Sequence, residues 1–214
     1  LGYRCSRVDL FFSHEAIRSA AKPPVPTHKW RGLAPDTISA DLEWNNLGLN
    51  ASDALQMAKQ LLSLSPLKAL KYAYLYQNKL GDDGIASIAR ALKREHAPGL
   101  LQLHLHSNGI GSAGAIALAR ECSPSPSLEV LSLNDNMIGD DGADALADAL
   151  SNTTLSASVL VMHGNPAIST AARKRLLAAC PGCTFDKPVP GTGATPYIPL
   201  NHTPQRWVTA SDVE

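Results

Sequence analysis

The stretch Leu128–Leu150, LEVLSLNDNMIGDDGADALADAL, decides the fold of this chain. Counting from Leu128 as repeat position 1, leucines occupy positions 1, 4 and 6, Asn136 occupies position 9 and Ile138 occupies position 11. From Asp140 onward the stretch is rich in alanine and leucine at helical spacing, and its two leading acids suit a helix N-terminus. The stretch therefore predicts a short strand, a turn and a helix, in that order.

The same pattern returns along the chain. Leu100–Ala119, LLQLHLHSNGIGSAGAIALA, repeats it, and another copy begins at Leu70. A weaker upstream copy places Ala40 and Leu42 at positions 4 and 6, and a degenerate copy follows Leu128–Leu150. The five asparagines assigned to position 9 are 33, 30, 28 and 29 residues apart, at Asn45, Asn78, Asn108, Asn136 and Asn165.

Stacking of these units explains why the same spacing recurs in each copy. One strand–turn–helix unit cannot bury its own apolar side, so neighbouring units stack and share a continuous core. Side chains alternate along a strand, so positions 4 and 6 point inward while positions 3, 5 and 7 point outward. A buried asparagine amide is costly unless it is paired. We therefore expect the asparagines to line up in one row as structural residues.

These segments resemble the leucine-rich-repeat family, in particular its ribonuclease-inhibitor-like class with long, helix-containing repeats. The resemblance covers about residues 37–180. It implies an α/β fold, a curved right-handed solenoid of about five repeats with inner parallel strands and outer helices. It also implies that each asparagine bonds backbone groups of adjacent coils. We predict three parts: a non-repeat N-terminal cap and linker (1–36), the solenoid (37–184) and an extended Pro/Gly-rich C-terminal arm (185–214).

The outward positions predict a partner-binding patch on the concave surface. Three tyrosines form the second row, between a first row that contains two acids and a third row that contains two histidines. Tyrosine is a common interface anchor because it offers apolar area and one hydroxyl at low entropic cost. The predicted partner-binding residues are Tyr72, Tyr74, Tyr76, His104, His106, Asp41 and Glu43, with Trp44 at the rim. The alternative is that a covering segment, for example a terminus of this chain, lies over them.

Two other groupings raise the question of chemistry. His104 and His106 share one strand face, but a metal site needs three or four converging ligands, and His163 is two strands away. Cys180 and Cys183 have the spacing of a redox or zinc half-site, yet a second pair is missing and a packing role is favoured. We predict no metal, no cofactor and no catalytic residue.

Composition limits the kinds of partner. Lys plus Arg and Asp plus Glu both number 19, so the formal net charge is zero, which argues against bulk attraction to nucleic acid or an anionic membrane. Four cysteines are too few for a disulfide-dense secreted scaffold, which favours an intracellular setting, cytoplasmic or organellar. We predict a non-catalytic protein–protein interaction scaffold, an accessory or structural subunit of a larger complex, without a small-molecule substrate. The alternative is a GTPase-activating protein of the Ran type.

Overall fold

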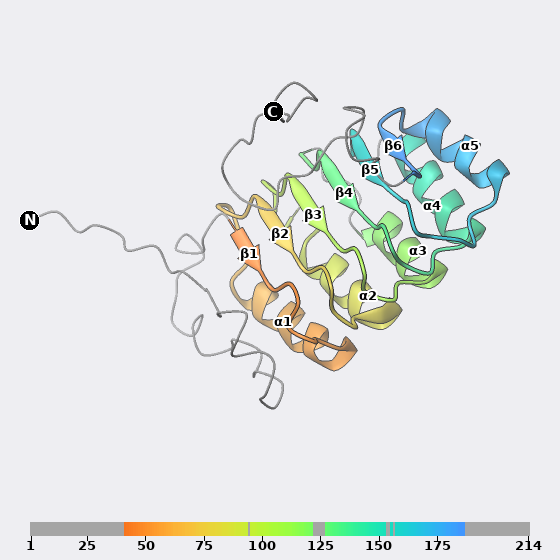
Figure 1. Cartoon of the computed structure of the whole chain (residues 1–214). Helices are drawn as coiled ribbons and strands as arrows, with labels where there is room; N and C mark the ends of the chain where they lie inside the picture. The colour runs from red at the N-terminus through yellow and green to blue at the C-terminus, as the bar shows by residue number, and fades with distance from the viewer. Residues whose placement is uncertain (1–40, 94, 122–126, 153–154, 156, 187–214) are drawn as a thin grey trace, which may run out of the picture.

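Strands and helices alternate along the described part of the chain. The computed structural model describes residues 41–186, apart from residues 94, 122–126, 153–154 and 156. Its strands are β1 (Asp41–Glu43), β2 (Tyr72–Tyr74), β3 (Gln102–His104), β4 (Val130–Ser132), β5 (Val159–Val161) and β6 (Cys183–Thr184). Its helices are α1 (Ala51–Ser63), α2 (Gly81–Ala91), α3 (Ser112–Glu121), α4 (Asp140–Ser151) and α5 (Thr170–Ala179). The predicted strand–turn–helix unit is confirmed (Figure 1).

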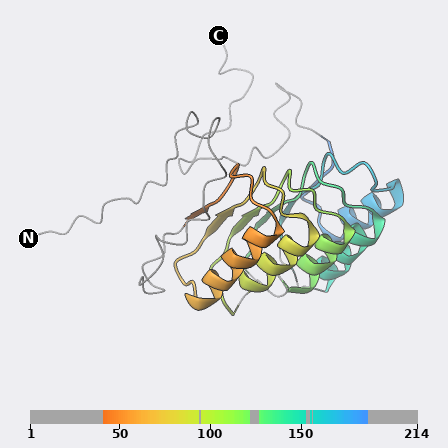
Figure 2. The ribbon, with the colours of Figure 1, turned by 90° about the horizontal axis from the view of Figure 1, so that it is seen from below.

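The strands form one parallel sheet in which neighbours in sequence are neighbours in space, in the order β1 to β6. The helices form a second layer on one side of this sheet, as Figure 2 shows. A helix with its side chains is about 10 Å wide, whereas neighbouring strands lie about 4.8 Å apart. The stack therefore bends with the strands on its inner side. The sheet face that points away from the helices is called the concave face below.

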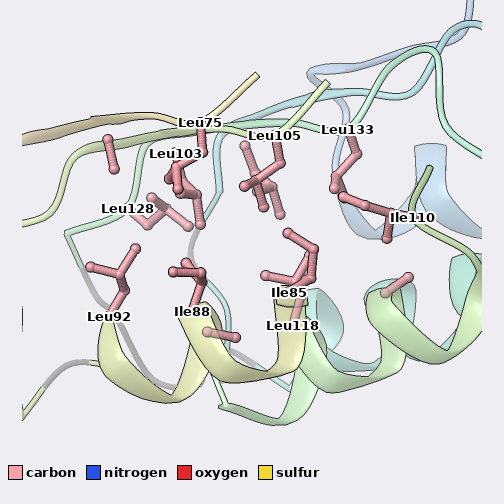
Figure 3. Close-up of a cluster of buried hydrophobic side chains, with 14 of the residues drawn as sticks. Leu75, Ile85, Ile88, Leu92, Leu103, Leu105, Ile110, Leu118, Leu128 and Leu133 are labelled. Carbon is pink, nitrogen blue, oxygen red and sulfur yellow. The ribbon is translucent and has the colours of Figure 1, made fainter. Parts of the chain in front are cut away.

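The core lies between the sheet and the helix layer, where leucine and isoleucine side chains of both layers meet (Figure 3). Strand positions 4 and 6 supply one side, for example Leu103 and Leu105, and both are fully buried. Helix residues such as Ile88 and Leu118 supply the other side. Burying one such side chain contributes about 1.5–3 kcal/mol. Since every coil repeats these contacts, the core runs through the whole stack.

A ladder of four asparagines joins the coils at position 9: Asn78, Asn108, Asn136 and Asn165 are all buried. The Asn136 side-chain oxygen accepts hydrogen bonds from the backbone N–H groups of Asn108 (3.0 Å) and Ile110 (3.1 Å) in the preceding coil. Its amide group donates to the carbonyl oxygens of Leu105 and Leu133. One side chain thus pairs backbone groups of two coils, and the Leu105 and Leu133 carbonyl oxygens also accept from the side chains of Asn108 and Asn165.

The first repeat has a different register from the one that we predicted, and Asn45 is not part of the ladder. Asp41 pairs with Tyr72 in the sheet, so Asp41 is at position 3 and Asn45 at position 7. The backbone confirms this shift of two residues, because position 8 has a positive φ in each of the first four repeats, at Asn46, Gln77, Ser107 and Asp135. Leu47 therefore stands at position 9, where its N–H donates to the Asn78 side chain (3.0 Å).

The same shift corrects two other assignments in the first repeat. Trp44 takes position 6, the inward position of Leu75 and Leu105, and it is fully buried in the core instead of at the rim of the concave surface. On α1, Met57 is fully buried, whereas Leu55, the residue that an alignment on Asn45 would turn toward the core, is 45% exposed. The weak copy lacks the asparagine that marks position 9, so its apparent alignment on Asn45 was wrong.

Polar side chains at helix starts connect successive helices. The Asp82 side chain, at the start of α2, accepts hydrogen bonds from the N–H groups of Gly111 (2.6 Å) and Gly114 (2.9 Å) at the start of α3. Asp140, in the first turn of α4, accepts from the N–H of Ser169, just before α5. Helix N-termini have unpaired N–H groups, and here the preceding coil satisfies them.

The predicted N-terminal cap (1–36) lies outside the described residues, as does the C-terminal arm after Asp186. Phe185, which we assigned to the arm, packs against the core instead. The guanidinium carbon of Arg173 lies 5.2 Å from the centre of its ring. Phe185, directly after β6, therefore belongs to the solenoid and covers part of its core.

Candidate functional site

The concave face is built from positions 3, 5 and 7 of each repeat, and the sheet pairing sets these side chains in rows. Tyr72 pairs with Asp41 on one side and Gln102 on the other, and Tyr74 pairs with Glu43 and His104. Tyr76 and His106 stand at position 7 of their repeats. The predicted residues of the second and third repeats therefore do lie together on the structure's concave face.

The rings of this patch stack on one another. Tyr74 and His104 lie with ring centres 5.0 Å apart and planes 21° apart, and Tyr72 stacks on Tyr74 at 6.4 Å. Tyr76 and His106 form the closest pair, at 4.4 Å and 8°. Neighbouring parallel strands bring equivalent side chains within about 5 Å of each other, so the stacking of Tyr74 on His104 and of Tyr76 on His106 follows from the pairing of β2 with β3.

The middle row of the patch is buried, contrary to the prediction that it projects into the open. Tyr74 is 5% exposed and His104 is 1% exposed. Each stands at position 5, with other side chains before and after it on its own strand and beside it on the next strands. Tyr72, Tyr76 and His106 keep part of their surface exposed, and Glu43 is exposed. The accessible part of the predicted patch therefore lies in its two outer rows and at β1.

Burial sets the protonation of the two histidines. It lowers the pKa of His104 to about 4, with a smaller contribution from the neighbouring His106. Burial also lowers the pKa of His106, although the Asp135 carboxylate acts in the opposite direction. Both imidazoles are consequently neutral at physiological pH.

The tyrosines respond to burial and to the acids of β1. Burial raises the pKa of Tyr74 to about 12, and the Asp41 and Glu43 carboxylates add to the rise. Burial, followed by the Glu43 carboxylate, also raises the pKa of Tyr76. These phenols stay protonated at physiological pH and present ring faces and hydroxyl groups to a ligand.

A polar network continues the patch across β4, outside the predicted site residues. The Ser132 hydroxyl donates to the Asn134 side-chain oxygen (2.7 Å), and the Asn134 amide donates to the Asp135 carboxylate (2.9 Å). The Ser132 oxygen also lies 3.5 Å from Nδ1 of His106. Ser132, Asn134 and Asp135 are at positions 5, 7 and 8 of the fourth repeat, beside the histidines of the third. These repeat positions were the sequence feature from which the network could have been predicted.

The histidines and cysteines form no metal centre within the residues that the structure describes: no group of three or more His, Cys, Asp or Glu side chains converges there. Cys180 and Cys183 are buried free thiols. The Cys180 thiol donates to the carbonyl oxygen of Ala157 (3.4 Å). Burial raises the pKa of Cys180, and it raises that of Cys183 to about 12. The thiolate is the reactive form, so both side chains behave as small core residues.

Comparison with known proteins supports the repeat assignment. A family model described as a leucine-rich repeat matches residues 98–119 and 125–147, which fall in the third and fourth repeats. No curated protein matches the chain significantly. The ribonuclease-inhibitor-like class stays a prediction. No helix in the described ranges is both long and apolar enough to cross a membrane.

Proposed function

We propose that this chain, whose third and fourth repeats match a leucine-rich-repeat family model, is an accessory or structural subunit whose concave face binds a partner protein. Leucine-rich repeats generally form a non-catalytic interaction fold, so a protein partner is the expected ligand. The single observation that carries the proposal is the pair of stacked rings at position 7, Tyr76 on His106.

This arrangement suits a contact surface for two physical reasons. Stacking fixes Tyr76 and His106 before a partner arrives, so little side-chain entropy remains to be lost on binding. Both residues offer apolar ring area together with a polar atom, the combination found at interface hot spots. Tyr72 adds a second ring at position 3 of the same repeat. The solenoid core behind these residues keeps the surface rigid.

Quantitative affinity purification from the source cells tests the proposal with variants of the full chain. Tyr76→Ala removes the partly exposed ring, and Arg90→Ala removes a large exposed side chain from α2 on the opposite layer. We expect Tyr76→Ala to reduce the recovery of specific partners at least about fivefold, the effect of losing one interface anchor. Arg90→Ala should leave recovery unchanged, and both variants should melt within about 4 °C of the wild-type protein.

Equal recovery with Tyr76→Ala and the wild-type chain would show that the partner contacts another surface. Loss of partners with Arg90→Ala alone would place the contact on the helix layer. Among the described residues no observation favours the GTPase-activating alternative, which stays a prediction.

A further inference from the structure

The last strand directs the chain toward the row of the sheet that carries the stacked rings. Thr184 stands at position 5 because β6 pairs in register with β5, and its carbonyl oxygen accepts a hydrogen bond from the Met162 N–H (2.8 Å). Counting on from Thr184, the exposed Asp186 is at position 7. Position 7 is also the row of Tyr76 and His106. The residues after Asp186 therefore start in the row of the stacked rings, at the far end of the sheet.

The sequence after Asp186 contains a proline motif. Residues 187–214, called the arm below, lie outside the described part of the chain, and residues 195–200 of the arm read TPYIPL. Pro196 and Pro199 are three residues apart, which is the period of the polyproline II helix, so this conformation sets both rings on one side. Proline motifs of this spacing bind aromatic-lined surfaces, and they lose little entropy because the conformation exists before binding.

The stacked rings at position 7 offer such an aromatic surface. Tyr76 and His106 lie with ring centres 4.4 Å apart and planes 8° apart, and each keeps part of its surface exposed. Burial lowers the pKa of His106 and raises that of Tyr76, so both rings are uncharged at physiological pH. Uncharged rings held in a fixed position suit contact with the apolar ring of a proline.

The motif is long enough a way along the arm to reach these rings. β6 and β2 are four strands apart in the sheet (Figure 1), a distance of about 19 Å at about 4.8 Å per strand. A polyproline II segment rises about 3.1 Å per residue, so Pro196, ten residues after Asp186, extends up to about 31 Å from it. Val189, three residues after Asp186, extends only about 9 Å and stays near β6.

The covalent link to the solenoid favours the arm over a similar segment of another protein. A tethered segment has an effective concentration on the order of 1 mM. A contact with a dissociation constant of about 100 µM is then occupied about 90% of the time, whereas a separate protein at about 1 µM would fill it to about 1%. A competing partner would bind about tenfold more weakly while the arm is in place.

We propose that residues 195–200 of the arm dock on the Tyr76–His106 ring pair of the same chain and compete there with the partner protein. This inference rests on the proposed function and adds the regulation of its site. A partner that uses the ring pair must first displace the arm, so any event that holds the arm elsewhere strengthens partner binding.

Photo-crosslinking from the arm tests the contact in the purified full chain. Ile198→p-benzoylphenylalanine places a photoreactive ring between Pro196 and Pro199 and leaves the concave face unchanged. Mass spectrometry of the digested product locates each crosslink. We expect crosslinks within one molecule to β2, β3 and the turns that follow them. Val189→p-benzoylphenylalanine is the matched control and should crosslink only near β5 and β6, because it does not reach the rings.

Variants of the solenoid link the crosslink to the ring pair. With the photoreactive ring at position 198, Tyr76→Ala should lower the yield of the crosslink to β3 at least about threefold, the effect of losing one anchor. Arg90→Ala, on the helix layer, should leave the yield unchanged. Circular dichroism of each variant confirms that the fold is intact.

Variants of the arm test the competition, with affinity purification as the measurement. Pro196→Ala with Pro199→Ala should increase the recovery of Tyr76-dependent partners at least about threefold, because the arm no longer occupies the rings. Pro188→Ala with Pro190→Ala makes the same change of composition short of the rings and should leave recovery unchanged. A decrease in recovery with the first pair would overturn the competition, since the arm would then help to hold the partner.

The outcomes separate this inference from the proposed function. Crosslinks from position 198 to the helix layer, or equal yields with and without Tyr76, would overturn the inference. Crosslinked dimers whose yield rises with protein concentration would also overturn it, since a second copy would then supply the segment. Each of these results leaves the proposed function standing. The proposed function fails when partner recovery is independent of Tyr76, a result that removes the competition but leaves the crosslink unchanged.

Discussion

Replacing Asn136 with alanine tests whether the asparagine ladder holds the coils together. The Asn136 side chain makes five hydrogen bonds to backbone groups, two as acceptor and three as donor. It is 5% exposed, and the N–H groups that it satisfies belong to the buried residues Asn108 and Ile110. Water can hardly replace these bonds, so alanine leaves backbone groups unpaired inside the protein.

The expected loss of stability follows from the backbone groups that the Asn136 side chain pairs. A buried polar group without a partner costs about 1–3 kcal/mol, and such costs are not fully additive within one network. Two unpaired N–H groups and several weakened carbonyl contacts therefore predict a decrease of about 3–5 kcal/mol in the free energy of unfolding. This is a large fraction of the total of about 5–15 kcal/mol that is typical of a natural domain.

Urea unfolding of the full chain, followed by circular dichroism at helical wavelengths, measures this loss, with Asn45→Ala as the matched control. Asn45 is the same residue type in the first repeat, but it stands at position 7, partly exposed and off the ladder. We expect its replacement to change stability by less than about 0.5 kcal/mol. A loss below about 1 kcal/mol for Asn136→Ala, or an equal loss for Asn45→Ala, would refute the reasoning about the ladder and its register.

Further predictions concern the first repeat and the buried histidine. Met57→Ala should cost about 2–5 kcal/mol because Met57 is fully buried, whereas Leu55→Ala should cost less than about 0.5 kcal/mol because Leu55 is 45% exposed. If the urea midpoints rank the two variants in the opposite order, the first repeat is aligned on Asn45 after all. Burial keeps the pKa of His104 near 4, below its ordinary value of 6.5, so only the unfolded chain takes up this proton between these values. The contribution of His104 to the free energy of unfolding is then fully present above pH 6.5. It decreases as the pH falls toward 4, by up to about 3 kcal/mol. His104→Gln should show a correspondingly smaller decrease over this window, and identical pH profiles would show that the buried imidazole does not control it.

The accessible surface of the candidate site could not be predicted from the strand pattern alone. Alternation along a strand indicates which side chains leave the core, and Tyr72, Tyr74 and Tyr76 do occupy the concave face together. How much of each remains exposed depends on neighbours from other coils. Tyr74 is nearly inaccessible because it stands in the middle row, stacked on both Tyr72 and His104.

The sequence by itself determined the repeat, the α/β architecture and the ladder positions of Asn78, Asn108 and Asn136, because each strong copy carries apolar residues at all of its inward positions. Only the tertiary structure decided the register of the first repeat. There the pattern allows two alignments, and pairing of Asp41 with Tyr72 selects the one that buries Trp44. The spacing of residues within one repeat can be read from the sequence. Register in a parallel sheet and burial of an outward side chain depend instead on contacts between coils about 30 residues apart.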